Sequence, residues 1–164
     1  MFNVGDKVVY PMHGAGIIEA IEEKEILGEK KKYYIMRIPI GDMKVMIPMG
    51  NVDEIGLREV VDGKAIDQVL GILRDDQTIM STNWNRRYRA NLDKIKSGDI
   101  YEIAGVVRNL MLRDSEKGLS TGERKMLDNA KQILISELVL AKNLNQEEAF
   151  ALLDNIISEK NASF

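Results

Sequence analysis

Hydrophobic residues in the first third of the chain form short runs that stop at proline or glycine. Such runs, with partial alternation of apolar and polar positions, are typical of β-strands bounded by tight turns. The predicted strands cover residues 4–10, 17–26, 32–38, 43–47 and a short 57–61. Leu27-Gly28-Glu29-Lys30 predicts a hairpin turn between the second and the third of them. Five short strands with tight turns predict a small, strongly twisted, barrel-like sheet.

The hydrophobic period changes after Asp62, where apolar residues recur every three or four positions. Predicted helices cover residues 66–73, 83–96, 99–113, 120–142 and 146–159, with a polar loop at 75–83. Ser120 and Glu123 have the spacing of a capping box, in which two side chains satisfy exposed backbone donors at a helix start, and Asn145 caps the last helix. The sequence therefore predicts an α+β protein, with a small β domain at 1–61, a bundle of about five helices at 62–160 and a tail at 161–164.

The composition narrows the possible functions. Hydrophobic residues make up 45% of the 164 positions and charged residues 30%, which suits an ordinary folded protein. No apolar run is long enough to cross a bilayer, and the N-terminus lacks the layout of a signal peptide, so we expect a cytoplasmic location. The absence of cysteine excludes disulfides, thiolate metal sites and cysteine nucleophiles. The single histidine, His13, has no evident catalytic partner and is interpreted as a turn residue. We expect no metal, no cofactor and no enzymatic activity.

The run Asn83-Trp84-Asn85-Arg86-Arg87-Tyr88-Arg89 holds the only tryptophan of the chain. From Asn83 to Lys96 there are five cations and one anion, in a protein whose formal net charge is −3. Arginines that bind phosphates, beside an aromatic ring that stacks on a base or wedges into a distorted step, are typical of nucleic-acid contact. The run therefore favours a local contact with nucleic acid.

The same tryptophan also fits the buried face of a helix, because Trp84, Tyr88 and Leu92 follow one another at intervals of four residues. Against this, Arg86 and Arg87 fall in the first helical turn, where the helix dipole disfavours cations. Exposed backbone N–H groups at that position suit an anion such as phosphate. The residues alone leave both interpretations open.

Two further features bear on partners. Arg124 and Lys125 lie in the first turn after the capping box, and would extend a phosphate-binding surface if the fold placed them beside the Trp84 run. The β domain has no basic patch, and its methionines and sheet edges suit a protein partner instead.

Four segments of the chain resemble the CarD-like bacterial transcription regulators, and together they span nearly its full length. The first, at 4–16, resembles an opening that this family shares with the polymerase-interacting domain of transcription-repair coupling factor. The other three resemble the helical half of CarD-like proteins and lie at 82–92, 106–110 and 118–127. The asparagine-tryptophan-x-arginine-arginine run that begins at Asn83 is the most specific of these motifs.

The resemblance implies a Tudor-like, SH3-like N-terminal domain that docks on the β subunit of RNA polymerase. It also implies a helical domain that contacts promoter DNA with little sequence preference. In the family, the tryptophan matching Trp84 wedges into the minor groove at the upstream edge of the transcription bubble. The residues implied to hold the DNA backbone are Arg86, Arg87, Arg89, Arg124 and Lys125.

The implied polymerase-binding residues are Lys24, Ile26 and Met46. Some family members have arginine at the positions of Lys24 and Met46. Lys24 keeps the charge but lacks the planar fork of arginine, and Met46 lacks the charge. The docking surface is therefore expected to occupy a similar place with different chemistry.

The leading hypothesis is a non-enzymatic regulator that binds polymerase through residues 1–60 and stabilises melted promoter DNA with Trp84 and its arginines. The alternative is a protein-interaction or scaffolding module that does not bind DNA. Exposure of Trp84 in the folded protein discriminates between them, because a fully buried ring could not reach a base.

Overall fold

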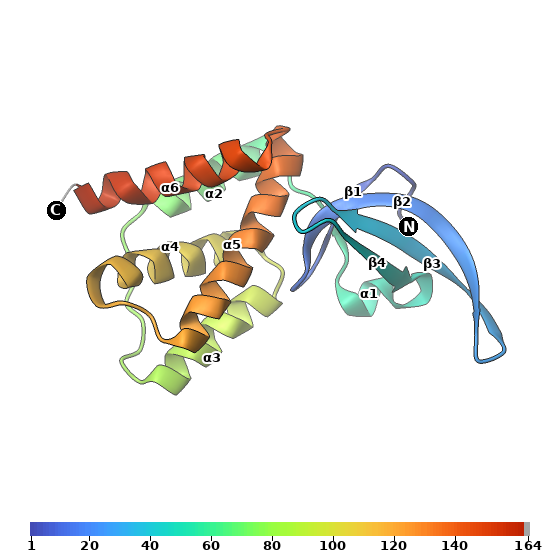
Figure 1. Ribbon diagram of the computed structural model, residues 1–164, viewed down its shortest axis with the longest axis horizontal. Helices are drawn as coiled ribbons and strands as arrows, with labels where there is room; N and C mark the ends of the chain where they lie inside the picture. Colours follow the sequence, from blue (N-terminus) through green and yellow to red (C-terminus); the bar gives the residue numbers. More distant parts are fainter. Residues whose placement is uncertain (163–164) are drawn as a thin grey trace.

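A computed structural model describes residues 1–162 of the chain, which form a five-stranded antiparallel sheet followed by a group of helices (Figure 1). The sheet occupies one end of the long axis of the molecule and the helices occupy the other. The α+β class predicted from the sequence is confirmed.

The five strands follow the predicted order along the chain. They are β1 (Lys7–Tyr10), β2 (Gly14–Ile26), β3 (Glu29–Ile38), β4 (Met43–Pro48) and β5 (Arg58–Glu59). Their order in the sheet is β4-β3-β2-β1-β5, so β4 is an edge strand. Strands β2 and β3 continue past the rest of the sheet as a hairpin that points away from the helices (Figure 1). Leu27 and Gly28 both have positive φ, as a two-residue hairpin turn of type I′ requires.

The strand limits differ from the prediction at several places. Strands β2 and β3 begin three residues earlier than predicted, at Gly14 and Glu29, so Glu29 and Lys30 of the predicted turn belong to β3. The first strand begins at Lys7 rather than at residue 4, because Gly5 has a φ of 94° and donates its N–H to the Ile18 carbonyl, which turns the chain. The predicted strand 57–61 is reduced to β5, Arg58–Glu59. A 3-10 turn (Met49–Asn51) and the short helix α1 (Val52–Ile55) were not predicted, since single turns are too short to establish a period.

The five longer helices are α2 (Gly63–Arg74), α3 (Trp84–Lys96), α4 (Ile100–Lys117), α5 (Thr121–Lys142) and α6 (Gln146–Ala162). The predicted bundle of about five helices is thus confirmed. Three helices run further than predicted, since α2 covers Gly63–Arg74, α4 continues to Lys117 and α6 to Ala162. The first two residues of the predicted tail at 161–164 therefore belong to α6, and the last two lie outside the described residues.

Each half of the chain has its own buried apolar cluster. The sheet packs Val8, Ile18, Tyr34, Met36 and Ile47 against the side on which α1 lies. The helices bury a larger cluster built around Ile66, Leu73, Ile103, Leu110 and Leu134. Each such side chain contributes about 1.5–3 kcal/mol when fully buried, so the helical part supplies most of the apolar stabilisation.

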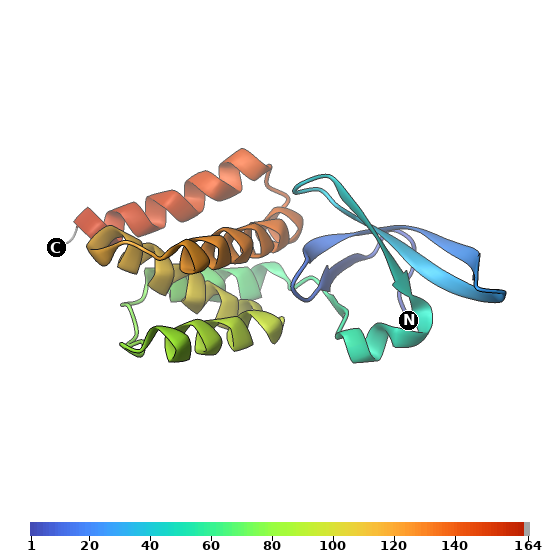
Figure 2. The same ribbon diagram turned by 60° about the horizontal axis from the view of Figure 1, so that its bottom comes forward.

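Helix α5 connects the helical cluster to the sheet. The Ser136 hydroxyl accepts the Ala15 N–H at 2.8 Å, and the buried Glu137 carboxylate binds the Arg58 guanidinium at 2.7 and 2.8 Å. Lys7 donates its ammonium to the Leu140 carbonyl at 2.9 Å. The C-terminal half of α5 therefore lies against β1, β2 and β5. The N-terminus of α5 lies beside α3, about 23 Å along the helix from Ser136 (Figure 2).

Candidate nucleic-acid interface

Helix α3 begins at the tryptophan that the sequence singled out. Asn83 is its N-cap, and the Asn83 side chain accepts the Arg86 N–H at 3.1 Å. Burial along the helical stripe increases with distance from this end: Trp84 is 40% exposed, Tyr88 and Leu92 are half-buried, and Ile95 is 1% exposed. Trp84 is therefore the first residue of an inward-facing stripe and is also open to solvent, so both sequence interpretations describe part of its environment.

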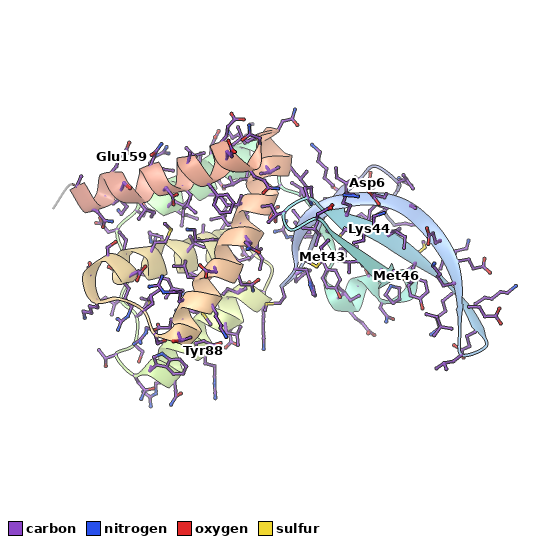
Figure 3. The ribbon with its side chains drawn as sticks, viewed as in Figure 1. Asp6, Met43, Lys44, Met46, Tyr88 and Glu159 are labelled. Carbon is purple, nitrogen blue, oxygen red and sulfur yellow. The ribbon has the colours of Figure 1, made fainter. Side chains whose placement is uncertain are left out.

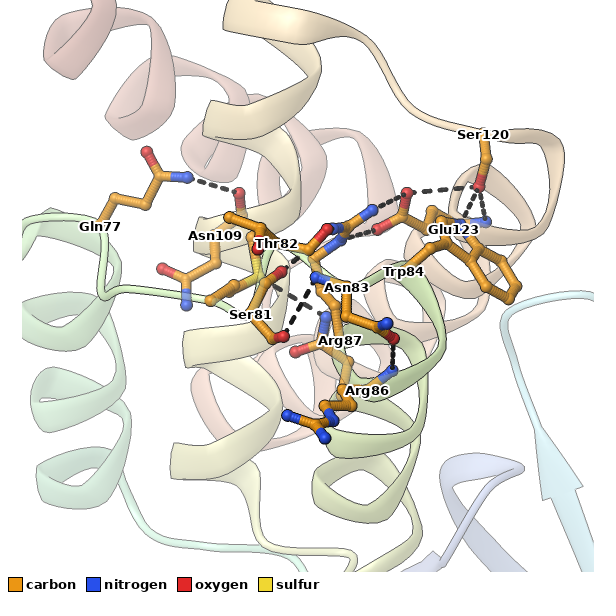
Figure 4. A network of polar contacts seen from close by, with 12 residues as sticks. Gln77, Ser81, Thr82, Asn83, Trp84, Arg86, Arg87, Asn109, Ser120 and Glu123 are labelled. Carbon is orange, nitrogen blue, oxygen red and sulfur yellow. Dashed lines mark hydrogen bonds and ion pairs between the residues drawn. The ribbon is translucent and has the colours of Figure 1, made fainter.

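Three contacts hold the indole ring of Trp84. It stacks on Tyr88 with ring centroids 4.9 Å apart and an interplanar angle of 17°. Its Nε1–H donates to the Ser120 hydroxyl at 2.9 Å (Figure 4). Gly122, in the first turn of α5, lies against the six-membered edge of the ring. These contacts bring the N-termini of α3 and α5 together, an adjacency that the sequence alone could not establish.

Two of the predicted arginines are exposed on α3, two and five residues after Trp84. Arg86 and Arg89 are three residues apart and lie on the same side of α3. Within residues 1–162, neither side chain has a hydrogen-bond or ion-pair partner. In Figure 4 the dashed line at Arg86 ends on its backbone nitrogen and not on its guanidinium group. Both guanidinium groups are thus available to an external anion.

Arg87 has a different environment from the other predicted DNA-binding residues. Its side chain is 4% exposed and forms a bidentate ion pair with Glu123, itself 2% exposed, at 2.7 and 3.2 Å. Its remaining nitrogen donates to the Ser81 and Thr82 carbonyls at 3.1 and 3.4 Å. The hydrogen bond from Arg87 lowers the pKa of Glu123 and raises that of Arg87. The structure therefore turns Arg87 inward, where it joins α3 to α5 instead of facing a phosphate.

The predicted second basic spot lies next to the first one. Arg124 and Lys125 are exposed near the N-terminus of α5, the helix whose Gly122 and cap residue Ser120 contact Trp84. Arg124 forms an ion pair with Asp114 at 2.7 Å, which raises the pKa of Arg124. In the described part of the chain the Lys125 side chain has no such partner. Lys125 is therefore the freer of these two cations for phosphate.

The loop before α3 is shaped by a residue that the sequence did not assign to the site. Asn109 of α4 is buried, and its amide accepts the Thr78 N–H at 3.1 Å and donates to the Thr78 hydroxyl at 2.7 Å. The adjacent carbonyl of Asn109 accepts from Gln77 at 3.5 Å (Figure 4). Asn109 lies in the 106–110 segment that carried the family resemblance, which was the available signal for its role.

The three predicted polymerase-binding residues share one face of the sheet. Met46 pairs with Ile35, and Ile35 with Ala20, which has the same parity on β2 as Lys24 and Ile26. Ile26 is 48% and Met46 45% exposed, and Lys24 forms only a surface ion pair with Glu22. Figure 3 places Met46 on the edge strand β4. This face combines exposed apolar side chains with unpaired backbone groups of an edge strand, which suits a protein partner.

Other candidate chemistry is sparse. His13 lies in the turn between β1 and β2, as predicted, and contacts the Tyr10 ring edge-on at 4.3 Å. Among residues 1–162 there is no group of three or more histidine, cysteine or acidic side chains placed to hold a metal ion. No helix in that range combines the length and apolar character needed to span a membrane.

Comparison with known proteins matches both halves of the chain. Residues 2–61 match the family described as CarD-like/TRCF RID domain, and residues 68–154 match the family CarD, C-terminal domain. The protein called "Putative transcription factor YdeB" from Bacillus subtilis (strain 168) is 48% identical over 148 residues, which is 90% of this chain and 97% of that protein. The solution NMR structure of the 72-residue N-terminal domain of Myxococcus xanthus CarD is 41% identical, covers 36% of this chain and 79% of its own, and has a TM-score of 0.32.

Proposed function

This chain belongs to the CarD-like family of transcription factors, and from that premise we propose that it docks on the RNA polymerase β subunit and stabilises the promoter open complex with Trp84. The proposed activity is binding without catalysis. The observation that carries the proposal is the environment of Trp84, whose ring is held by a stack and a hydrogen bond while the residue stays 40% exposed.

A ring held in this way suits a wedge at the edge of melted DNA. Stacking between an aromatic side chain and a base is worth about 1–3 kcal/mol and does not depend strongly on which base is present. A base at the fork of a bubble lacks a stacking neighbour on one side, so Trp84 gains a partner there that duplex DNA does not offer. The protein consequently favours the open complex over the closed one by its differential affinity.

Phosphate contacts near the starts of α3 and α5 would supply position and affinity. Arg86, Arg89 and Lys125 are exposed and unpaired within the described residues, at the start of two adjacent helices. Such contacts are not sequence-specific, in keeping with a protein that acts at the bubble edge of many promoters. Arg124 would have to exchange Asp114 for phosphate, so we assign it a smaller part.

The sheet supports docking on polymerase. Its outer face carries Lys24, Ile26 and Met46 beside the edge strand β4, and this part of the chain matches the RID family. Anchoring through the sheet raises the local concentration of the Trp84 surface at the promoter, so a weak DNA contact suffices. Contacts of α5 with both the sheet and Trp84 would keep anchor and ring at a fixed separation.

The experiment that tests this function measures open-complex lifetime on a defined promoter after competitor challenge, with and without the protein, alongside co-purification with polymerase. We expect co-purification and a longer lifetime. Co-purification without any change in lifetime would favour the alternative, a protein-interaction module that does not bind DNA. Absence of co-purification would contradict docking through the sheet.

A second prediction concerns salt. Replacing Arg86 and Arg89 with serine is expected to weaken binding to polymerase–promoter complexes and to reduce the slope of log affinity against log salt by about one for each arginine, because each phosphate contact releases counterions. The measurement is a titration at four or more salt concentrations. Arg74→Ser, which removes an exposed charge from α2, is the matched control and should leave the slope unchanged.

A further inference from the structure

We infer that Ser120 is a positioning residue that fixes the orientation of Trp84 before DNA arrives; this inference rests on the proposed function. Ser120 does so through what we call the indole network, which consists of Trp84, Ser120, Glu123 and Arg87 (Figure 4).

The hydrogen-bonding capacity of the Ser120 hydroxyl is completely used. It accepts the indole N–H of Trp84 at 2.9 Å and the backbone N–H of Glu123 at 3.2 Å, and it lies 3.3 Å from the Glu123 carboxylate, to which it donates. A hydroxyl has one donor and two acceptor sites, so these three bonds fix its direction. The helix cap and the indole therefore depend on the same oxygen.

The network closes on itself through the buried ion pair. Glu123 receives Ser120 on one side and Arg87 on the other, while Trp84 and Arg87 both belong to the first turn of α3. In an ordinary capping box the glutamate reaches back to the backbone N–H of the cap residue. Here the Glu123 carboxylate faces Arg87 and the Ser120 hydroxyl instead, which ties the first turns of α3 and α5 into one unit.

Gly122 completes the support by allowing close approach. A Cβ at this position would lie 3.3 Å from Cζ2 of the Trp84 ring, closer than side-chain atoms ordinarily pack. The ring is thus confined by Tyr88 on one face, by α5 along one edge and by Ser120 at Nε1. A tryptophan at the end of a helix otherwise samples several rotamers, and ordering it on binding would oppose stacking on DNA.

The test uses Ser120→Ala in the full chain, with open-complex lifetime and the fluorescence of Trp84, which as the only tryptophan reports on this site alone. We expect the lifetime to fall about threefold, because ordering one side chain in advance is worth about a decade at most in an equilibrium constant. We also expect lower fluorescence anisotropy and stronger acrylamide quenching. Ser120→Thr keeps the hydroxyl and should restore both readouts.

Two further variants separate positioning from helix stability. Asn145→Ala removes the N-cap of α6, which forms a capping box with Glu148 far from Trp84 in the sequence. It should leave both the lifetime and the Trp84 fluorescence at wild-type values. Gly122→Ala introduces a better helix former but displaces the ring, so it should shorten the lifetime without destabilising the protein. If Ser120→Ala unfolds the chain, Ser120→Gly replaces it, since glycine is a tolerable cap.

The outcomes distinguish the inference from the proposed function. A lifetime shortened by Trp84→Ala but unchanged by Ser120→Ala would overturn the positioning role and leave the proposed function intact. A lifetime unchanged by Trp84→Ala would overturn the proposed function and the inference with it. Equal loss in Ser120→Ala and Asn145→Ala would show that helix stability is responsible, and would also overturn the inference.

Discussion

Replacing Trp84 with alanine is expected to shorten the lifetime of the promoter open complex about tenfold, the loss that corresponds to one base–aromatic stack. The ring contributes through its exposed part, which alanine removes entirely. The fold should survive, because the ring packs mainly on Tyr88 and such an aromatic pair is worth only about 0.5–1.5 kcal/mol beyond its buried area. The measurement is the decay of competitor-resistant complexes with saturating protein.

Trp84→Phe is the informative companion variant. Phenylalanine retains a π-face for stacking but has no N–H to donate to Ser120, so its lifetime should lie between those of wild type and Trp84→Ala. Affinity for polymerase alone should be equal in all three proteins, because Trp84 lies at the end of α5 that faces away from the sheet. A wild-type lifetime for Trp84→Ala, with polymerase binding intact, would contradict the wedge.

The partial exposure of Trp84 follows from a pattern that is visible in the sequence. Trp84, Tyr88, Leu92 and Ile95 share a helical face, and Asn83 marks where that helix starts. A stripe that reaches the first residue of a helix must end there, so its first member has neighbours on one side only. The extent of exposure depends on what lies across from it, and that is Ser120 and Gly122 from a different helix, a contact that the sequence could not provide.

Arg87 shows the opposite case. Its charge and its place in a basic run grouped it with Arg86 and Arg89, yet its spacing from Asn91 and Ile95, four and eight residues later, is that of an inward-facing position. The spacing thus indicated a buried position, whereas the surrounding basic residues indicated an exposed one. Its partner Glu123 lies 36 positions away, and a pairing over such a separation is decided by helix packing and not by local pattern.

The sheet was predictable where turn chemistry is strict and less so elsewhere. Leu27-Gly28 and the prolines at strand ends set the hairpin and the limits of β3 and β4. The start of β1 depended on a hydrogen bond between Gly5 and Ile18, and α1 on a single turn, neither of which leaves a periodic signature. Turn residues and periodicity thus predict which strands form. Hydrogen bonds between residues distant in the sequence decide where the strands begin and what they contact.

The largest expected effect on folding comes from breaking the ion pair between Arg87 and Glu123. Glu123→Gln leaves a guanidinium buried without its counter-charge, and removing one partner of a buried pair typically costs about 3–5 kcal/mol of unfolding free energy. Arg86→Gln is the matched control, because Arg86 is next to Arg87 in the sequence but is exposed and unpaired among the described residues. It should change the free energy of unfolding by less than about 0.5 kcal/mol. Urea unfolding at neutral pH measures both.

The same pair predicts how stability depends on acid. Arg87 holds the pKa of Glu123 below its ordinary value in the folded state, so the unfolded chain takes up this proton first as pH falls. The stabilisation is therefore complete above the unfolded-state pKa of about 4.3 and is lost as the pH falls through the lower, folded value. The difference in unfolding free energy between wild type and Glu123→Gln should be constant from pH 7 to about pH 5 and then shrink.

A double replacement distinguishes the ion pair from mere packing. Arg87→Met combined with Glu123→Leu removes both charges and fills similar volume, and apolar replacements of buried pairs are often neutral or stabilising. We therefore expect the double variant to recover most of the stability lost in Glu123→Gln. Its free energy of unfolding should lack the contribution of the Glu123 carboxyl group to the dependence on pH. It should nevertheless lose part of the open-complex lifetime, because Ser120 would no longer have the Glu123 carboxylate that fixes its hydroxyl toward Trp84. Full stability with a wild-type lifetime would show that the ion pair serves the fold alone.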